Sequence, residues 1–293
     1  MRALGFLAMV CALLAACGGR DPPFRWRDGA TVTAEFRVRE ELLPARLARE
    51  VRISTRGVVR NGSEIALDIL SVGHESIRAG ATVSAVDTET SGAVASERSS
   101  SDAAIARVAE RLLGRTVVLT FDGEDGLRSV EGLDAALAAA AGDPDAAAAR
   151  DGLAPLVGDA PILRSLRAAG LSAPPENFRD KAAAVELRAD VYVPGRGVVL
   201  CRFLGDVGAD TDGSPIVRWN GRVRGDADAK GPPGDAPPED VGDVLLARIE
   251  GQAETQYDAV RATPLRGNAT LRMPFARGAT IATTTSFVLA VGP

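Results

Sequence analysis

The stretch TVTAEFRVR, which spans Thr31 to Arg39, alternates apolar and polar residues without interruption. Every second residue from Val32 to Val38 is apolar, and the residues between them are threonine, glutamate and arginine. Successive side chains of a β-strand point to opposite faces, so this pattern predicts a strand with one buried and one solvated face. Strands of this kind are typical of antiparallel sheets.

The same alternation recurs along the chain on both sides of a helical middle. Further strands are expected at residues 65–69, 117–121, 185–193, 217–223, 245–249 and 279–291. Helices are expected at residues 101–114, 133–141, 143–150 and 159–170, where capping residues, a first-turn proline and glycine stops frame the runs. This order predicts an α+β fold with a large curved, mainly antiparallel β-sheet, built as two meanders with a central helical insertion.

A single α+β domain is expected over residues 24–293. It would be strand-rich at 30–121 and 183–292 and helical at 101–170. Residues 224–240, RGDADAKGPPGDAPPED, are rich in acid, glycine and proline and lack the apolar groups that would favour ordering. We therefore expect a mobile loop there.

The first 23 residues carry a targeting pattern. Arg2 precedes an apolar run that is too short to span a bilayer, and Leu14-Ala15-Ala16-Cys17 follows it. These four residues resemble the lipobox of bacterial lipoproteins. The resemblance implies a signal peptide at 1–16, a lipid anchor on Cys17 and a flexible tether at 17–23. Gly18 stands where many inner-membrane lipoproteins have aspartate, which favours the outer membrane, facing the periplasm.

Charge and cysteine usage narrow the possible partners. The net charge of −5 disfavours nucleic acid, and removal of a leader that contains Arg2 but no acid would make it −6. The chain has three cysteines, of which Cys11 falls in the leader and Cys17 would carry the anchor. Cys201 then has no partner for an internal disulfide, and its apolar surroundings predict a small buried side chain.

We expect no catalytic residue, metal or cofactor. His74 is the one histidine, which excludes a two-histidine zinc site, and we interpret it as a surface turn residue. No serine elbow, phosphate-binding loop or dinucleotide fingerprint occurs. Two acidic groups match no calcium loop and are interpreted as turns: Asp206, Asp210 and Asp212, and Asp122, Glu124 and Asp125.

The run TVVLTFDGEDGLRSVEGLDA, Thr116 to Ala135, resembles a segment of uncharacterised bacterial envelope proteins. It shares with them a strand that ends in Phe-Asp, a glycine turn, a second short strand and a helix start. The resemblance implies no activity, because the family has no established function. The layout is also similar to that of envelope carriers and chaperones for lipids or lipoproteins, which implies a curved sheet around an apolar cavity beneath helices.

Three functions remain open at this level. The first is a non-enzymatic cell-envelope lipoprotein that binds an apolar ligand (a lipid or lipopeptide) or a protein partner. The second is a carboxylate-dependent hydrolase of envelope glycans. The third is a structural or interaction module without a ligand. The first is favoured by an excess of apolar residues in the helical zone: Ile105, Val108, Leu112, Ile162, Leu163 and Leu166. Trp219 is expected in the core, and Trp26 against the first strand or at lipid headgroups.

Overall fold

A computed structural model describes most of the chain. The described residues are 26–89, 92–93, 100–122, 126–139, 144–172, 174–175, 178–180, 182–193, 197–222, 249–274 and 278–292. The predicted leader, the anchor residue Cys17, the tether and the acidic loop at 224–240 all lie outside them.

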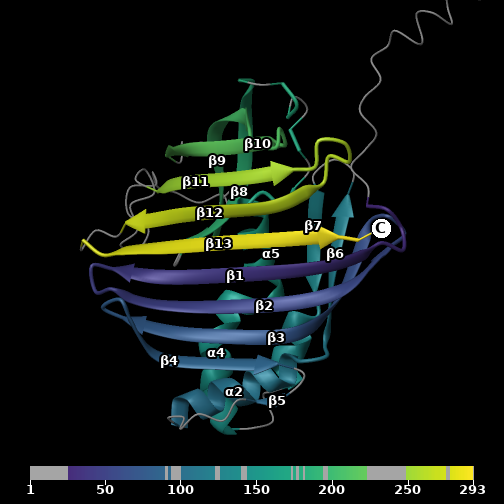
Figure 1. Cartoon of the computed structure of the whole chain (residues 1–293). Helices are drawn as coiled ribbons and strands as arrows, with labels where there is room; N and C mark the ends of the chain where they lie inside the picture. The colour runs from purple at the N-terminus through teal and green to yellow at the C-terminus, as the bar shows by residue number, and fades with distance from the viewer. Residues whose placement is uncertain are drawn as a thin grey trace, which may run out of the picture.

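The described strands form one large antiparallel sheet (Figure 1). They are β1 (Thr31–Leu43), β2 (Leu47–Arg60), β3 (Glu64–Arg78), β4 (Ala81–Glu89), β5 (Gly92–Ala93), β6 (Thr116–Asp122), β7 (Gly126–Glu131), β8 (Ala184–Val193), β9 (Gly197–Ala209), β10 (Pro215–Arg222), β11 (Glu250–Tyr257), β12 (Pro264–Pro274) and β13 (Thr280–Val291). The predicted large antiparallel sheet is therefore confirmed.

The sheet consists of two runs of sequential strands that meet in its middle. Its order is β5-β4-β3-β2-β1-β13-β12-β11-β10-β9-β8, so each strand within a run neighbours the next one in sequence. The runs are joined by β1 and β13, which are paired from Val32 with Val291 to Leu43 with Thr280. Phe36 and Phe287 are partners in this pairing, and both are buried. The seam between the runs therefore lies over the hydrophobic core.

Different halves of β3 pair with different strands. Its first half, Glu64 to Asp68, pairs with β6, and its second half, Ser71 to Arg78, pairs with β4. The β6–β7 hairpin thus branches from the sheet. In sequence this hairpin lies between helix α2 and the other helices, so the helical zone is interrupted by strands.

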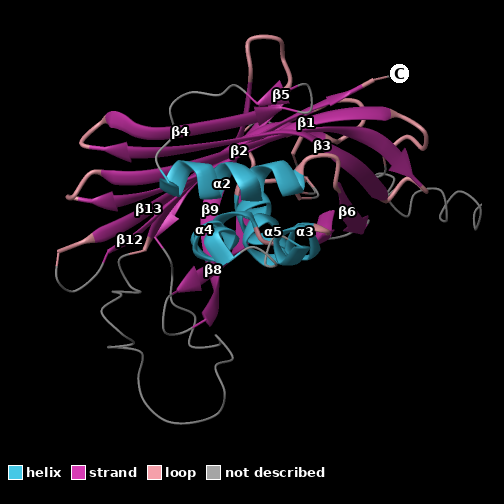
Figure 2. Cartoon of the chain, turned by 90° about the horizontal axis from the view of Figure 1, so that it is seen from below, coloured by secondary structure: helices cyan, strands magenta, loops and turns pink. Residues whose placement is uncertain are grey.

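Four helices occur in the described part of the chain: α2 (Ser100–Leu112), α3 (Leu133–Ala139), α4 (Pro144–Val157) and α5 (Asp159–Ala168). Figure 2 shows them gathered on one face of the sheet. The inward residues of the strands and the buried faces of the helices form one hydrophobic core. Val108, Leu112 and Leu166 are each at most 1% exposed within it.

Both tryptophans are buried. Trp219 on β10 lies in the core as expected. Trp26 packs edge-on against Phe121 of β6 with ring centroids 5.5 Å apart, and its backbone N–H donates to the carbonyl of Gly62. Trp26 therefore secures the start of the described chain to the β6–β7 branch.

The interpretation of His74 as a surface turn residue is wrong. His74 lies within β3, is only 4% exposed, and is the register partner of Val51 on β2 and of Val86 on β4. Val51 belongs to the core, so His74 points to the same face of the sheet as the helices. The run Ser-Val-Gly-His suggested a turn because of its glycine, but the extended pairing continues through Gly73.

No helix among the described residues combines the length and the apolar character that a membrane crossing needs.

Candidate ligand pocket beneath the helices

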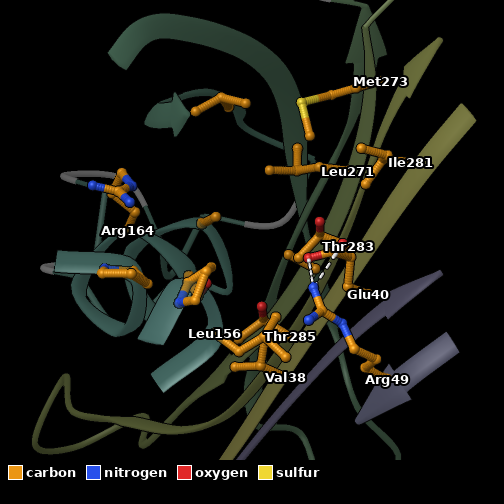
Figure 3. A pocket seen from close by; sticks show the side chains of 16 residues that line it. Val38, Glu40, Arg49, Leu156, Arg164, Leu271, Met273, Ile281, Thr283 and Thr285 are labelled. Carbon is orange, nitrogen blue, oxygen red and sulfur yellow. Dashed lines mark hydrogen bonds and ion pairs between the residues drawn. The ribbon is translucent and has the colours of Figure 1, made fainter. Parts of the chain in front are cut away.

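A partly open pocket of about 290 Å³ lies between the sheet and helices α4 and α5 (Figure 3). The sheet lines it with Val38 and Glu40 of β1, Arg49 of β2, Val191 of β8, Ala269, Leu271 and Met273 of β12, and Ile281, Thr283 and Thr285 of β13. The helices line it with Pro155 and Leu156 of α4 and with Pro161, Arg164, Ser165 and Ala168 of α5.

The strand register places the sheet side of the pocket in rows. The deepest row runs Val38, Thr285 and Ala269, and the next runs Arg49, Glu40, Thr283 and Leu271. The outer row is formed by Ile281 and Met273, and the strand register continues it beyond the pocket lining to Leu42 and Leu47. Because every second residue of a strand shares a face, these rows all point toward the helices. From the inside outward the wall is therefore mainly apolar, then polar at Arg49, Glu40 and Thr283, then apolar, and the innermost row also includes the buried Thr285.

The polar row is centred on an ion pair. Arg49 Nη2 lies 3.3 Å from Glu40 Oε1 and 3.5 Å from Oε2, and the two side chains are 42% and 31% exposed. At this exposure solvent screens the attraction, so the pair adds little to stability. The pair matters for binding, because it places a guanidinium and a carboxylate among mainly apolar lining residues.

Helix α5 forms the opposite wall, and its N-terminus is fixed by α3. The Leu133 N–H donates to Asp159 Oδ1 at 2.8 Å, and the Asp159 N–H donates to Asp134 Oδ1 at 3.2 Å. Each helix thus provides a carboxylate that satisfies a free N–H at the start of the other. Burial raises the pKa of Asp159 above its ordinary value, although the hydrogen bond from Leu133 opposes the rise.

The C-terminus of α5 is fixed to β11. The Thr255 hydroxyl donates to the Ala169 carbonyl at 3.0 Å, and the Tyr257 hydroxyl donates to the Gly170 carbonyl at 3.4 Å. Both hydroxyl side chains are fully buried, and burial raises the pKa of Tyr257. Gly170 has φ +87°, and a Cβ on it would lie 1.7 Å from Thr255 Oγ1. The helix can therefore sit this close to the sheet only with glycine at 170.

The apolar helix residues that favoured a cavity at the sequence level do not line the pocket. Ile162 and Leu166 are buried, Ile105 and Leu163 are partly buried, and all four pack in the core with Val108 and Leu112. The helical lining comes instead from Pro155, Leu156, Pro161, Arg164, Ser165 and Ala168. The sequence could not reveal these residues, because a short α5 presents its core face and its pocket face within ten residues.

Of the acidic group Asp206, Asp210 and Asp212, the last two form a turn, as interpreted, whereas Asp206 lies within β9. Asp210 Oδ1 accepts from the Thr211 N–H and Asp212 Oδ1 from the Ser214 N–H, which closes the β9–β10 hairpin. Asp210 Oδ2 also accepts from Arg266 Nη2 at 2.9 Å. Within the part of the chain that the structure describes, no group of three histidine, cysteine, aspartate or glutamate side chains is arranged to hold a metal.

The carboxylate and thiol candidates from the sequence are not among the described residues that line the pocket. Among the described residues that line it, Glu40 is the only carboxylate, whereas a two-carboxylate hydrolase needs a pair. Asp122 ends β6 opposite Gly126, while Glu124 and Asp125 lie outside the described residues. Cys201 lies in β9, and its side chain is also outside the described set.

The opposite face of the sheet carries a network of charged residues. Glu50 on β2 is 1% exposed and receives hydrogen bonds from Arg37 Nη2 and Arg52 Nε, each at 2.8 Å. Arg39 Nη1 lies 4.0 Å away, and Arg52 also binds Glu75. Burial would raise the pKa of Glu50, but the hydrogen bonds and charges of Arg37 and Arg52 outweigh it, so the pKa is lowered.

Comparison with known proteins adds little to this geometry. No family model matches the chain, and no curated protein matches it. Among solved structures, one of lipovitellin, on its lipid–protein interactions, is similar to this chain. The similarity covers 91% of this chain and 26% of the lipovitellin chain. The identity is 9% and the TM-score 0.45. The chain spans about a quarter of that lipovitellin chain, and a likeness this distant carries no argument about function.

Proposed function

We propose that this protein binds one apolar chain of an amphiphile, such as a fatty acyl chain, in the pocket beneath α4 and α5. The observation that carries the proposal is the row arrangement of the sheet wall, in which apolar side chains lie on both sides of one polar row. Ligand pockets are mostly apolar with a few polar groups that fix orientation. The volume of about 290 Å³ lies at the small end for such pockets and suits one chain.

The charged residues of the pocket suggest the type of head group. Arg49 contributes a guanidinium from the sheet, partly neutralised by Glu40, and Arg164 contributes another from the helix side (Figure 3). Guanidinium groups bind carboxylate and phosphate oxygens well, because several N–H donors point the same way. We therefore favour an amphiphile with an acidic head over a neutral hydrocarbon.

The cellular setting rests on the sequence alone. In this proposal the protein is a cell-envelope lipoprotein anchored through Cys17, which would hold the pocket beside a membrane. Two or more acyl chains on the anchor would make that attachment stable, since one chain binds only marginally.

Two neighbouring threonines on β13 provide the test. Thr283 lines the pocket, whereas Thr284 points to the other face, where its hydroxyl shares a hydrogen bond with Thr270. We expect Thr283→Trp to fill the pocket and weaken binding of a fluorescent fatty acid by roughly tenfold or more, about 1.4 kcal/mol. Titration of the full chain with the probe, followed by fluorescence, measures the Kd.

Thr284→Trp is the matched control. It adds the same side chain one residue away on the same strand, and we expect its Kd to stay close to that of the unsubstituted chain. Saturable binding that both variants reduce equally would place the ligand elsewhere. Absence of saturable binding in the unsubstituted chain would leave the interaction module as the better interpretation.

A further inference from the structure

The apolar lining of the pocket continues to exposed residues at the ends of β1 and β2, where the two strands meet in a turn. Leu42 and Leu47 are cross-strand partners at the ends of β1 and β2, and they are 37% and 44% exposed. Leu42 is also the partner of Ile281, whose own partner is Met273, and both of these line the pocket. The outer row of the pocket wall is therefore partly buried at β12 and β13 and open at β1 and β2.

Two arginines lie beside the exposed leucines. Arg46 occupies the turn between β1 and β2, and Arg78 ends β3 as the register partner of Leu47. The two turns are adjacent, because the Ala79 N–H donates to the Arg46 carbonyl at 2.8 Å. Both arginine side chains are exposed. We call Leu42, Arg46, Leu47 and Arg78 together the mouth edge.

The acids closest to the mouth edge along β1 already have cationic partners. Glu40 is paired with Arg49, and Glu41 lies 3.3 Å from Arg39 Nη2. The mouth edge therefore combines exposed apolar side chains with an excess of positive charge. Leucine beside arginine is the composition that binds an anionic membrane surface, where the apolar groups enter the interface and the cations meet lipid phosphates.

We propose that the mouth edge rests on the surface of an anionic lipid bilayer, so that the pocket opens toward the membrane. Two leucines and two arginines make a small footprint, so the contact is weak and reversible. An amphiphile could then enter the pocket with its chain shielded from water. The inference goes beyond the proposed function, because contact with lipid needs no ligand in the pocket.

Two exposed apolar residues of β2 allow a controlled experiment on the full chain. Leu47 belongs to the mouth edge, whereas Val58, 41% exposed, lies near the other end of the same strand. Leu47→Trp and Val58→Trp are each mixed with vesicles of phosphatidylglycerol and brominated phosphatidylcholine. We expect bromine quenching that rises with lipid concentration, together with a blue shift, for Leu47→Trp, and neither for Val58→Trp. The buried Trp26 and Trp219 contribute background fluorescence, which is measured with the unsubstituted chain and subtracted.

The charge requirement is tested in the Leu47→Trp background. Replacement of both arginines, Arg46→Gln with Arg78→Gln, should lower the equilibrium constant for binding to the vesicles by roughly 10- to 30-fold. Vesicles without phosphatidylglycerol should give the same loss. Equal quenching at positions 47 and 58, or quenching that is unchanged without anionic lipid, would overturn the proposal. Any N-terminal anchor is the same in every variant, so it cannot create the difference.

Discussion

At the scale of single residues, Glu50 is the most constrained charge in the described structure. Its carboxylate is buried on the face away from the helices, where the side chains of Arg37 and Arg52 cover it. Those arginines remain nearly half exposed, so they keep much of their hydration while Glu50 loses its own. The arrangement links β1, β2 and β3 through charge rather than through apolar packing.

We expect Glu50→Gln to lower the free energy of unfolding by about 1.5–3 kcal/mol at pH 7, the range for hydrogen bonds to charged groups. The pKa of Glu50 is lowered in the folded state, so the unfolded chain binds its proton first as the pH falls. The stabilisation is therefore complete above the ordinary pKa of 4.5 and is lost below it. Urea unfolding of both proteins from pH 7 to pH 3 should show their difference shrinking.

Glu35→Gln is the control for this experiment, because Glu35 lies on the same strand as Arg37 but is exposed. Its effect should be small at every pH. A Glu50→Gln defect of constant size down to pH 3 would contradict a lowered pKa of Glu50 in the folded state.

At the scale of elements, the shape of the pocket depends on how helix α5 is held against the sheet. Its N-terminus exchanges carboxylate caps with α3, and its C-terminus is bound by Thr255 and Tyr257. Ala169 also lies against β12, where a Cβ on Gly267 would be 2.0 Å from the Ala169 carbonyl. The pocket keeps its shape because this wall is held at both ends.

Two glycines that end helices allow the cost of backbone strain to be measured separately from the cost of this close contact. Gly114 follows α2 with φ +68° and open space around it, whereas Gly170 follows α5 with φ +87° and lies against Thr255. We expect Gly114→Ala to cost about 1 kcal/mol, the penalty for a side chain at positive φ. Gly170→Ala should cost about 3 kcal/mol or more, because the clash adds to that penalty. Thermal and urea unfolding measure both, and equal losses would contradict the tight seating of α5.

Alternation in the sequence located β1, β3, β6, β8, β10 and β13, but it did not locate β2, β4, β9 or β12, and it gave no sign of the pocket. Period-two alternation found the strand at Val32 to Val38 because one face of it is wholly apolar. It failed at His74, where a glycine and a polar residue continue a buried strand. Glu40 and Arg49 gave no signal, because charged residues near the end of a strand normally face water. Their shared row depends on pairing between strands, which local pattern does not encode.

At the scale of the whole molecule, the two runs of strands share one core across the β1–β13 seam. A continuous core predicts that the runs unfold together. Trp26 reports on the first run, because its backbone N–H donates to the Gly62 carbonyl between β2 and β3, and Trp219 reports on the second run from β10. In the single-tryptophan variants Trp26→Phe and Trp219→Phe, we expect the fluorescence midpoint to equal the far-UV circular dichroism midpoint. A gap of several degrees in either variant would mean that the runs melt separately.

The seam also imposes an order of events in time. β1 is the first described strand to be made, yet one of its edges pairs with β13, the last. Throughout synthesis and any export, that edge presents free backbone groups beside an apolar face, which is a template for aggregation. Contacts between residues so far apart in sequence also form slowly. The open edge of β1 is therefore most prone to aggregation in the interval before β13 pairs with it, and that interval is set by the topology of the sheet.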